Sequence, residues 1–223
     1  MIKFDIITIF PEIFASYLNE SLIKRAQDKK LMKINVHNLR KWTKDKHKTV
    51  DGRPFGGGFG MVMKVEPVFK AVKALKKNSS GEKLKVILFT PRGRKFTQKT
   101  AYQFSKLDHV IMICGRYEGV DERVAKKIAD IELSIGDYVL MGGEIPAMAV
   151  IETTARLIPG VLGKEEMVKE RTTKKKGFTE YVQYTRPEVF EADGKKWSVP
   201  KVLLSGKHKA IEEWREKHSK TTY

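Results

Sequence analysis

The 223-residue chain has few of the residues that build cross-linked or metal-bound scaffolds. It contains a single cysteine, Cys114, so an internal disulfide and a cysteine-rich zinc site are both excluded. Its five histidines are scattered and form no His-Glu-x-x-His pair, so the sequence indicates no metal site. This cysteine usage is typical of a reducing compartment, and we expect a cytoplasmic protein.

Long apolar runs are absent too. No stretch approaches the roughly 18 residues that a membrane-spanning helix needs, so we expect no membrane partner. The N-terminal residues MIKFDIITIFPEIF lack a separate basic region and a small-residue cleavage site, and they predict a first strand and not a signal peptide.

Acidic residues are in short supply. The chain has 44 Lys and Arg against 27 Asp and Glu, which gives a net charge of +17. A globular protein this basic most often binds a polyanion, and nucleic acid is the first candidate. The alternative is a lysine-rich proteome that raises surface charge without a specific partner.

Short apolar runs alternate with helical patterns along the first 160 residues. Runs that are apolar on both faces and separated by helices predict an α/β fold with a mostly parallel sheet. We expect strands at 4–9, 33–39, 86–89, 110–114 and 138–141, and helices at 11–29, 65–77, 120–128 and 144–157, with Thr97 as the cap of a further helix.

Three glycine-containing loops, at 90–94, 115–119 and 142–143, follow predicted strands. Ligands of such sheets bind beyond the carboxyl ends of the strands, so these loops mark the expected site. None matches GxGxxG or GxxxxGK[ST], so neither a dinucleotide fold nor a phosphate-binding P-loop is supported. The alternative is that the glycines serve simple turns.

A basic, glycine-rich segment lies at 40–60, where we expect a long loop. Its lysines, Trp42 and the glycines at 56–58 and 60 favour contact with phosphates and bases of RNA, and the alternative is a solvated flexible loop. Glu152 and Arg156 form the polar stripe of an otherwise apolar helix; their i,i+4 spacing fits an ordinary ion pair, or an arginine directed into a site.

The composition changes after Gly160. Residues 161–177 are polar and charged and predict a flexible linker between a first domain, 1–160, and a second, 178–223, which we expect to be small and helical.

Several motifs together resemble the bacterial tRNA (guanine-N1)-methyltransferases of the TrmD family. They are HKTVDGRPFGGG (47–58), CGRYEGVDER (114–123), SIGDYVLMGGE (134–144), RLIPGVLG (156–163), YTRPEVFE (184–191) and VPKVLLSGKH (199–208). The resemblance runs along the whole chain.

The resemblance implies a SPOUT-type α/β fold whose part at about 86–160 forms a C-terminal trefoil knot that binds S-adenosylmethionine, in a homodimer whose sites use both chains. It places the cofactor pocket at Leu88, Pro91, Gly115, Gly119, Ile135, Gly136, Tyr138, Leu140, Gly142, Gly143 and Pro146. The substrate is tRNA with guanosine at position 37, and contacts to it are expected from His47, Asp51, Gly57, Gly58, Arg116, Tyr117 and Arg186.

The expected chemistry needs a base for the proton on guanine N1 and a cation for charge that grows on O6. By resemblance Arg156 serves O6, and Glu118 belongs to the site and is linked to Mg²⁺-dependent activity. The family's linker aspartate falls at Arg171 or Thr172 here, and neither is a base at neutral pH, so Glu170 is the candidate in its place.

Other departures are Phe59 where the family has proline, Arg92 where glutamine is common, and an end at Tyr223, before one or two helices that relatives usually carry. The lost aspartate leaves a second hypothesis open, a catalytically impaired protein that still binds cofactor and tRNA. A third, a general RNA- or ribosome-binding basic domain, does not require the motifs at 114–123 and 134–144.

Overall fold

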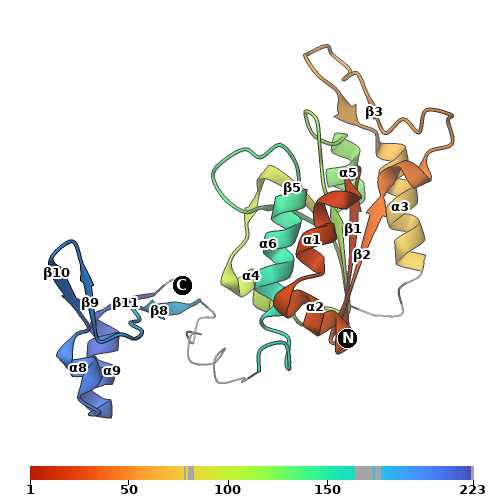
Figure 1. The fold of residues 1–223 in the computed structure, drawn as a ribbon. Coiled ribbons are helices and arrows are strands. Elements are labelled where there is room, and N and C mark those ends of the chain that lie inside the picture. Colours follow the sequence, from red (N-terminus) through yellow and green to blue (C-terminus); the bar gives the residue numbers. More distant parts are fainter. Residues whose placement is uncertain (78, 80–82, 164–172, 174–176, 222–223) are drawn as a thin grey trace. The chain divides into compact units, whose positions relative to one another are not determined.

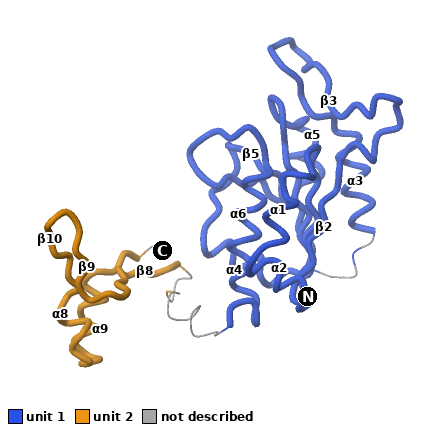
Figure 2. The backbone as a smooth tube through the Cα atoms, in the orientation of Figure 1, with its two compact units in different colours: residues 1–168 blue, residues 169–223 orange. Residues whose placement is uncertain are grey.

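The computed structural model describes residues 1–77, 79, 83–163, 173 and 177–221. The chain divides into two compact units, residues 1–168 and 169–223 (Figure 2). The division falls within the segment 161–177 for which the sequence predicts a linker. Most of that segment, including Glu170, Arg171 and Thr172, lies outside the described residues.

Unit 1 is built around a five-stranded sheet with the order β2-β1-β6-β5-β7, in which every neighbouring pair is parallel (Figure 1). The parallel α/β class predicted from the sequence is confirmed. The strands are β1 (Ile2–Thr8), β2 (Met32–Asn38), β5 (Leu84–Lys95), β6 (His109–Ile113) and β7 (Ile131–Ser134). A separate two-stranded ladder pairs β3 (Asp51–Gly52) with β4 (Val62–Met63).

Among the described residues, the helices of unit 1 are η1 (Pro11–Phe14), α1 (Ala15–Leu18), α2 (Ser21–Asp28), η2 (Leu39–Trp42), α3 (Val65–Lys77), α4 (Gln98–Phe104), α5 (Glu122–Lys127) and α6 (Glu144–Ala155). The single helix expected at 11–29 is in fact three short pieces. Thr97 caps α4 as expected, since its side-chain oxygen accepts a hydrogen bond from the backbone N–H of Thr100 at 3.3 Å.

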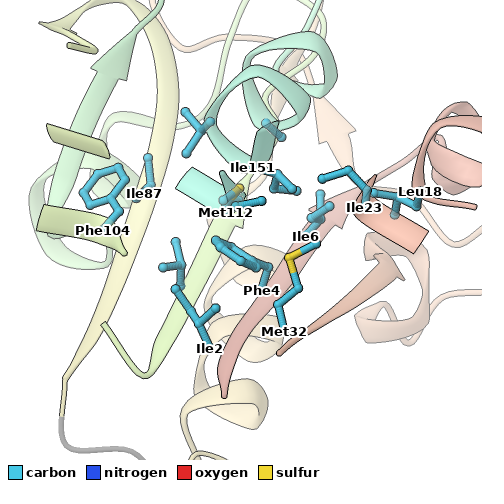
Figure 3. Packing of buried hydrophobic residues seen from close by; sticks show 14 of the residues in the cluster. Ile2, Phe4, Ile6, Leu18, Ile23, Met32, Ile87, Phe104, Met112 and Ile151 are labelled. Atoms are coloured by element: carbon cyan, nitrogen blue, oxygen red, sulfur yellow. The ribbon is translucent and has the colours of Figure 1, made fainter. Parts of the chain in front are cut away.

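Two apolar cores cover the two faces of the sheet, because successive strand residues point to opposite sides. Along β1, Phe4 and Ile6 join the core formed with η1, α1, α2, α4 and α6, and Ile7 joins the core formed with α3 and α5. Figure 3 shows the first core, where Met112 of β6 and Ile151 of α6 lie beside these β1 side chains. The sheet is thus held rigidly between two helical layers, and its carboxyl edge is left to carry loops.

One prediction for the sheet is wrong. The strand expected at 138–141 is a loop, and the last strand of the sheet is the earlier segment β7. The apolar side chains Val139 and Met141 are exposed, 81% and 89%. These two side chains line a pocket, described in the next section, and are not part of the sheet.

Unit 2 is mixed and not helical as expected. Alongside α8 (Lys201–Leu204) and α9 (His208–Lys217) it contains two antiparallel pairs of short strands, β8 (Thr179–Tyr181) with β11 (Ser219–Thr221) and β9 (Val189–Ala192) with β10 (Lys195–Ser198). Strands of three or four residues leave little periodicity to detect, although the Asp193-Gly194 pair is a hairpin-turn signal. No helix in the described part of the chain is both long and apolar enough to cross a membrane.

A buried carboxylate lies within the sheet of unit 1. Asp5 on β1 is fully buried and receives hydrogen bonds from Asn35 at 2.7 Å, His37 at 2.8 Å and His109 at 2.6 Å, with the Lys3 ammonium at 2.7 Å. Burial raises the pKa of this carboxyl, but the bonds from His109, His37, Lys3 and Asn35 outweigh burial and hold the pKa well below its ordinary value.

Asp5→Asn should lower the free energy of unfolding at pH 7 by about 3 kcal/mol, because it removes the charge that four partners surround. The folded pKa is depressed, so this stabilisation is complete above the unfolded pKa of about 4 and is lost gradually as pH falls from there toward the much lower folded pKa. Urea unfolding of wild type and variant at pH 7 and pH 3.5 should show the gap narrowing by roughly 0.7 kcal/mol at pH 3.5, where the unfolded carboxyl is partly protonated and the folded one is not. Asp28→Asn, at an exposed position, is the control, and a gap independent of pH would contradict the assignment.

Candidate active site

A cavity of 510 Å³ opens at the carboxyl ends of β5, β6 and β7. Its walls are residues 88–92 of β5, the loops that follow β6 and β7, and the first turn of α6. The loop expected at 90–94 is in fact an irregular part of β5, where the pairing with β7 shifts register between Phe89 and Arg94. The pocket includes all eleven predicted cofactor residues: Leu88, Pro91, Gly115, Gly119, Ile135, Gly136, Tyr138, Leu140, Gly142, Gly143 and Pro146. Arg116, Tyr117 and Glu118 line the pocket as well.

Backbone passes close to backbone in this pocket. The N–H of Gly143 donates to the carbonyl of Gly115 at 3.0 Å, and a Cβ on Gly143 would lie 2.6 Å from the Cα of Cys114. A Cβ on Gly142 would lie 2.3 Å from Nε of Arg116. At Gly143 the neighbour is backbone, so only glycine fits there, whereas a side chain at 142 would have to displace the Arg116 and Glu144 side chains.

A buried carboxylate fixes the start of α6. Glu144, the first residue of the helix, is 1% exposed; its Oε1 accepts from the Thr8 hydroxyl at 2.7 Å and its Oε2 from Nε of Arg116 at 2.9 Å. The Arg116 guanidinium also lies over the Phe10 ring, 4.9 Å from its centroid. Glu144 therefore joins the end of β1, the loop after β6 and α6, at a helix N-terminus that favours negative charge.

Cys114 is next to this network but is unsuited to nucleophilic chemistry. Its side chain is buried. Burial raises the pKa of the thiol well above its ordinary value; the Glu144 carboxylate raises it further, and Arg116 opposes the shift only in part. The thiol stays protonated at neutral pH and acts as a small apolar group of the core.

The pocket rim carries an ion pair that the sequence did not single out. The Arg92 guanidinium pairs with the Glu122 carboxylate, and its Nε lies 3.4 Å from Glu132. Hydrogen bonding to Glu122 raises the pKa of Arg92, and the same bond lowers the pKa of Glu122. The pair is exposed, so its role is to shape the rim and not to stabilise the fold.

Tyr117 connects the pocket to the basic segment. Its backbone has a φ of 62°, a left-handed conformation that is uncommon for a residue with a side chain. Burial raises the pKa of the Tyr117 hydroxyl, as do the charge and hydrogen bond of Asp51, whereas Arg40 opposes the shift. Asp51, predicted to contact substrate, thus lies beside the pocket loop. His47, Gly57 and Gly58 are exposed and do not line the pocket.

The remaining predicted residues lie elsewhere. Arg156 is the C-terminal cap of α6, ten residues after the pocket-lining Pro146, or about 15 Å along the helix axis. Glu152 and Arg156, both of which the structure describes, do not form the expected ion pair. The Glu152 carboxylate instead accepts a hydrogen bond from the Tyr17 hydroxyl. Glu170 lies outside the described residues, and Arg186 belongs to unit 2.

No cluster of three or more His, Cys, Asp or Glu side chains in the described ranges could hold a metal ion.

The sequence matches the family described as tRNA (Guanine-1)-methyltransferase TrmD over residues 2–223. The chain belongs to this family. A tRNA (guanine-N(1)-)-methyltransferase of Dictyoglomus turgidum is 54% identical over 98% of this chain and 85% of its own length. That of Carboxydothermus hydrogenoformans is 51% identical over 97% of this chain and 82% of its own.

The solved structure of the tRNA (m1G37) methyltransferase from Aquifex aeolicus superposes with a TM-score of 0.78 at 40% identity. The match covers 97% of this chain and 88% of that one. The TrmD family assignment and the SPOUT-type α/β class expected from the sequence are confirmed. The roles of individual pocket residues are taken up below as proposals.

Gly143→Ala should weaken binding of S-adenosylhomocysteine at least tenfold and lower the melting temperature, because the new methyl group overlaps the Cys114 backbone. Overpacking of this kind costs about 1–3 kcal/mol. Calorimetric titration and thermal unfolding measure the two effects. Gly163→Ala is the matched control, since a Cβ there meets nothing within 4 Å; equal behaviour of the two variants would contradict the close approach.

Proposed function

We propose that this protein transfers a methyl group from S-adenosylmethionine to N1 of guanosine 37 in tRNA, next to the anticodon. The observation that carries the proposal is the glycine-walled pocket at the carboxyl ends of β5, β6 and β7, which gathers all eleven residues expected to bind the cofactor. Family membership supplies the reaction class, and we place the enzyme in the cytoplasm, where tRNA is modified.

The residues present fit the cofactor. The volume of 510 Å³ lies within the range of small-molecule pockets, about 300–1,000 Å³. Leu88, Ile135 and Leu140 supply apolar walls, and the bare backbone at 142–143 supplies polar groups without bulk. S-adenosylmethionine supplies a methyl group already activated by its positively charged sulfur. Close passage of segment 142–143 against residues 114–115 supports our proposal that 86–160 is threaded as a knot.

The tRNA surface is assigned to the basic segment and the pocket rim. Between Arg40 and Lys64 the chain has seven basic residues and two acidic ones, a charge suited to phosphates. Arg116 and Tyr117 lie in the pocket wall, and Asp51 is beside them. We include His47, Gly57, Gly58 and, from unit 2, Arg186 among the substrate contacts.

The reaction requires that the proton on guanine N1 be removed so that its lone pair can attack the methyl carbon. We propose that the carboxylate of Glu170, on the linker, accepts this proton. The guanidinium of Arg156 stabilises the negative charge that develops on O6. Glu118 lines the pocket and is the candidate for the family's link to Mg²⁺. The protein's contribution is otherwise the alignment of donor and acceptor.

We further propose that the protein is a homodimer and that Arg156 of one subunit serves the pocket of the other. Within one chain Arg156 lies at the far end of α6 from the pocket. Apolar side chains at the pocket end of α6, in η1 and just before it remain exposed, including Phe10 at 46%, Ile13 at 40% and Ile145 at 57%. Such a surface is typical of a subunit interface.

The first test is methyl transfer from labelled cofactor to two tRNA transcripts that differ only in guanosine or adenosine at position 37. We expect incorporation into the first alone.

Glu170→Gln should lower the single-turnover rate about 10²- to 10⁴-fold, the usual contribution of a general base. An unchanged rate would exclude Glu170, and binding of cofactor and tRNA without transfer would indicate a catalytically impaired protein.

Sharing of sites between subunits predicts complementation. Arg156→Ala removes the O6 cation and Gly143→Ala damages the pocket, so each homodimer should be nearly inactive. In a mixed dimer, the intact pocket of the Arg156→Ala subunit faces the Arg156 of the Gly143→Ala subunit. Co-expression with two affinity tags should therefore yield mixed dimers with about half of wild-type activity, since one of the two sites is whole. Inactive mixed dimers would place Arg156 with its own pocket.

A further inference from the structure

Two phenylalanine side chains are fully exposed to solvent at the tip of the loop between β3 and β4. Phe55 and Phe59 have relative exposures of 101% and 99%, which means that the rest of the described chain covers neither ring. The glycines between and after them, Gly56, Gly57, Gly58 and Gly60, all have positive φ, from 79° to 120°. The loop is an arch of left-handed backbone that presents two aromatic rings and little else.

The foot of this arch, residues 60–63, is hydrogen-bonded to the loop after β6 that lines the pocket. The N–H of Glu118 donates to the Met61 carbonyl at 3.0 Å, and the N–H of Met63 donates to the Gly119 carbonyl at 2.9 Å. A Cβ on Gly60 would lie 2.5 Å from Cγ of Glu118, so the arch and this pocket-lining side chain are in direct contact. The foot of the arch therefore lies next to the pocket, and Phe59 is one residue from the Gly60 contact.

The charge around the arch favours RNA as the partner. Lys46, Lys48, Arg53 and Lys64 flank it, and the segment from Arg40 to Lys64 has seven basic residues against two acidic. Of the two acids, Asp45 accepts hydrogen bonds from Thr49 and Asp51 interacts with Tyr117. Fully exposed aromatic rings among basic side chains are how proteins bind single-stranded nucleic acid, since every base has a face for stacking.

We propose that Phe55 and Phe59 stack on the unpaired bases that flank the target guanosine. The proposal rests on the function proposed above. A base drawn into an enzyme pocket leaves its neighbours without a stacking partner, and this unstacking costs free energy. Aromatic rings placed at the pocket mouth replace the lost stacking and hold the RNA in the opened form. The two phenylalanines are thus positioning residues, which act on the neighbours of the reacting nucleotide.

The experiment uses two tRNA transcripts that carry 2-aminopurine at the nucleotide on the 5′ or on the 3′ side of guanosine 37. Flipping the target out should raise the probe's fluorescence, and stacking on a phenylalanine should quench it again. Wild type should therefore give a quenched complex with at least one transcript. Phe55→Leu/Phe59→Leu should give a bright complex and bind tRNA at least tenfold more weakly, as loss of base stacking does.

Three controls make the result specific. Phe55→Tyr/Phe59→Tyr should keep both quenching and affinity, because tyrosine stacks as well. Phe69→Leu should behave as wild type, since Phe69 is half-exposed on α3, where Lys73 lies 5.8 Å from its ring centroid. All variants should bind S-adenosylhomocysteine with unchanged affinity.

Quenching and tRNA affinity that survive in the double leucine variant would overturn the inference and leave the proposed function standing. A wild-type protein that does not methylate the unmodified guanosine-37 transcript would overturn both, and this is seen before any variant is made.

Discussion

The pocket depends on one close approach, the passage of segment 142–143 against residues 114–115. At this point the backbone of the loop after β7 donates a hydrogen bond to the backbone of the loop after β6. No side chain fits between them, because a Cβ added to Gly143 would lie only 2.6 Å from the Cys114 backbone. The pocket is therefore walled by two loops whose separation is fixed by main chain, which leaves little freedom for the pocket to change width.

A buried charge keeps this approach in place. Glu144 would cost several kcal/mol if it were buried without partners. It is bonded to Thr8 and Arg116, and the N-terminus of α6 adds a favourable dipole. Because Thr8 ends β1 and Arg116 follows β6, the requirement to satisfy one carboxylate aligns three elements that are distant in sequence. The same arrangement holds Arg116 at the pocket wall, where it is available to a substrate while its Nε remains bonded to Glu144.

The features that could be predicted from the sequence are those that a short local pattern of residues determines. Apolar runs located most strands of the sheet, and glycines after the strands located the pocket, because parallel strands end at one edge. The Glu144 network could not be predicted, since its bonds span 136 and 28 residues of sequence. The run at 138–141 was misread as a strand because a pocket wall and a buried strand use the same apolar residues. The true strand, β7, contains Glu132 and was overlooked. Arg156 was assigned through the family resemblance, and its place at the far end of α6 from the pocket follows from the helix bounds.

Strain at Tyr117 indicates how the pocket and the basic arch act together. A left-handed conformation with a side chain costs about 1–3 kcal/mol and persists only when its surroundings require it. Here the surroundings are Asp51 at one end of the arch and the backbone bonds of residues 118–119 to 61–63 at the other. Both ends of the arch are thus tied to the loop that lines the pocket. A displacement of the arch would therefore have to move Tyr117 and Glu118 with it.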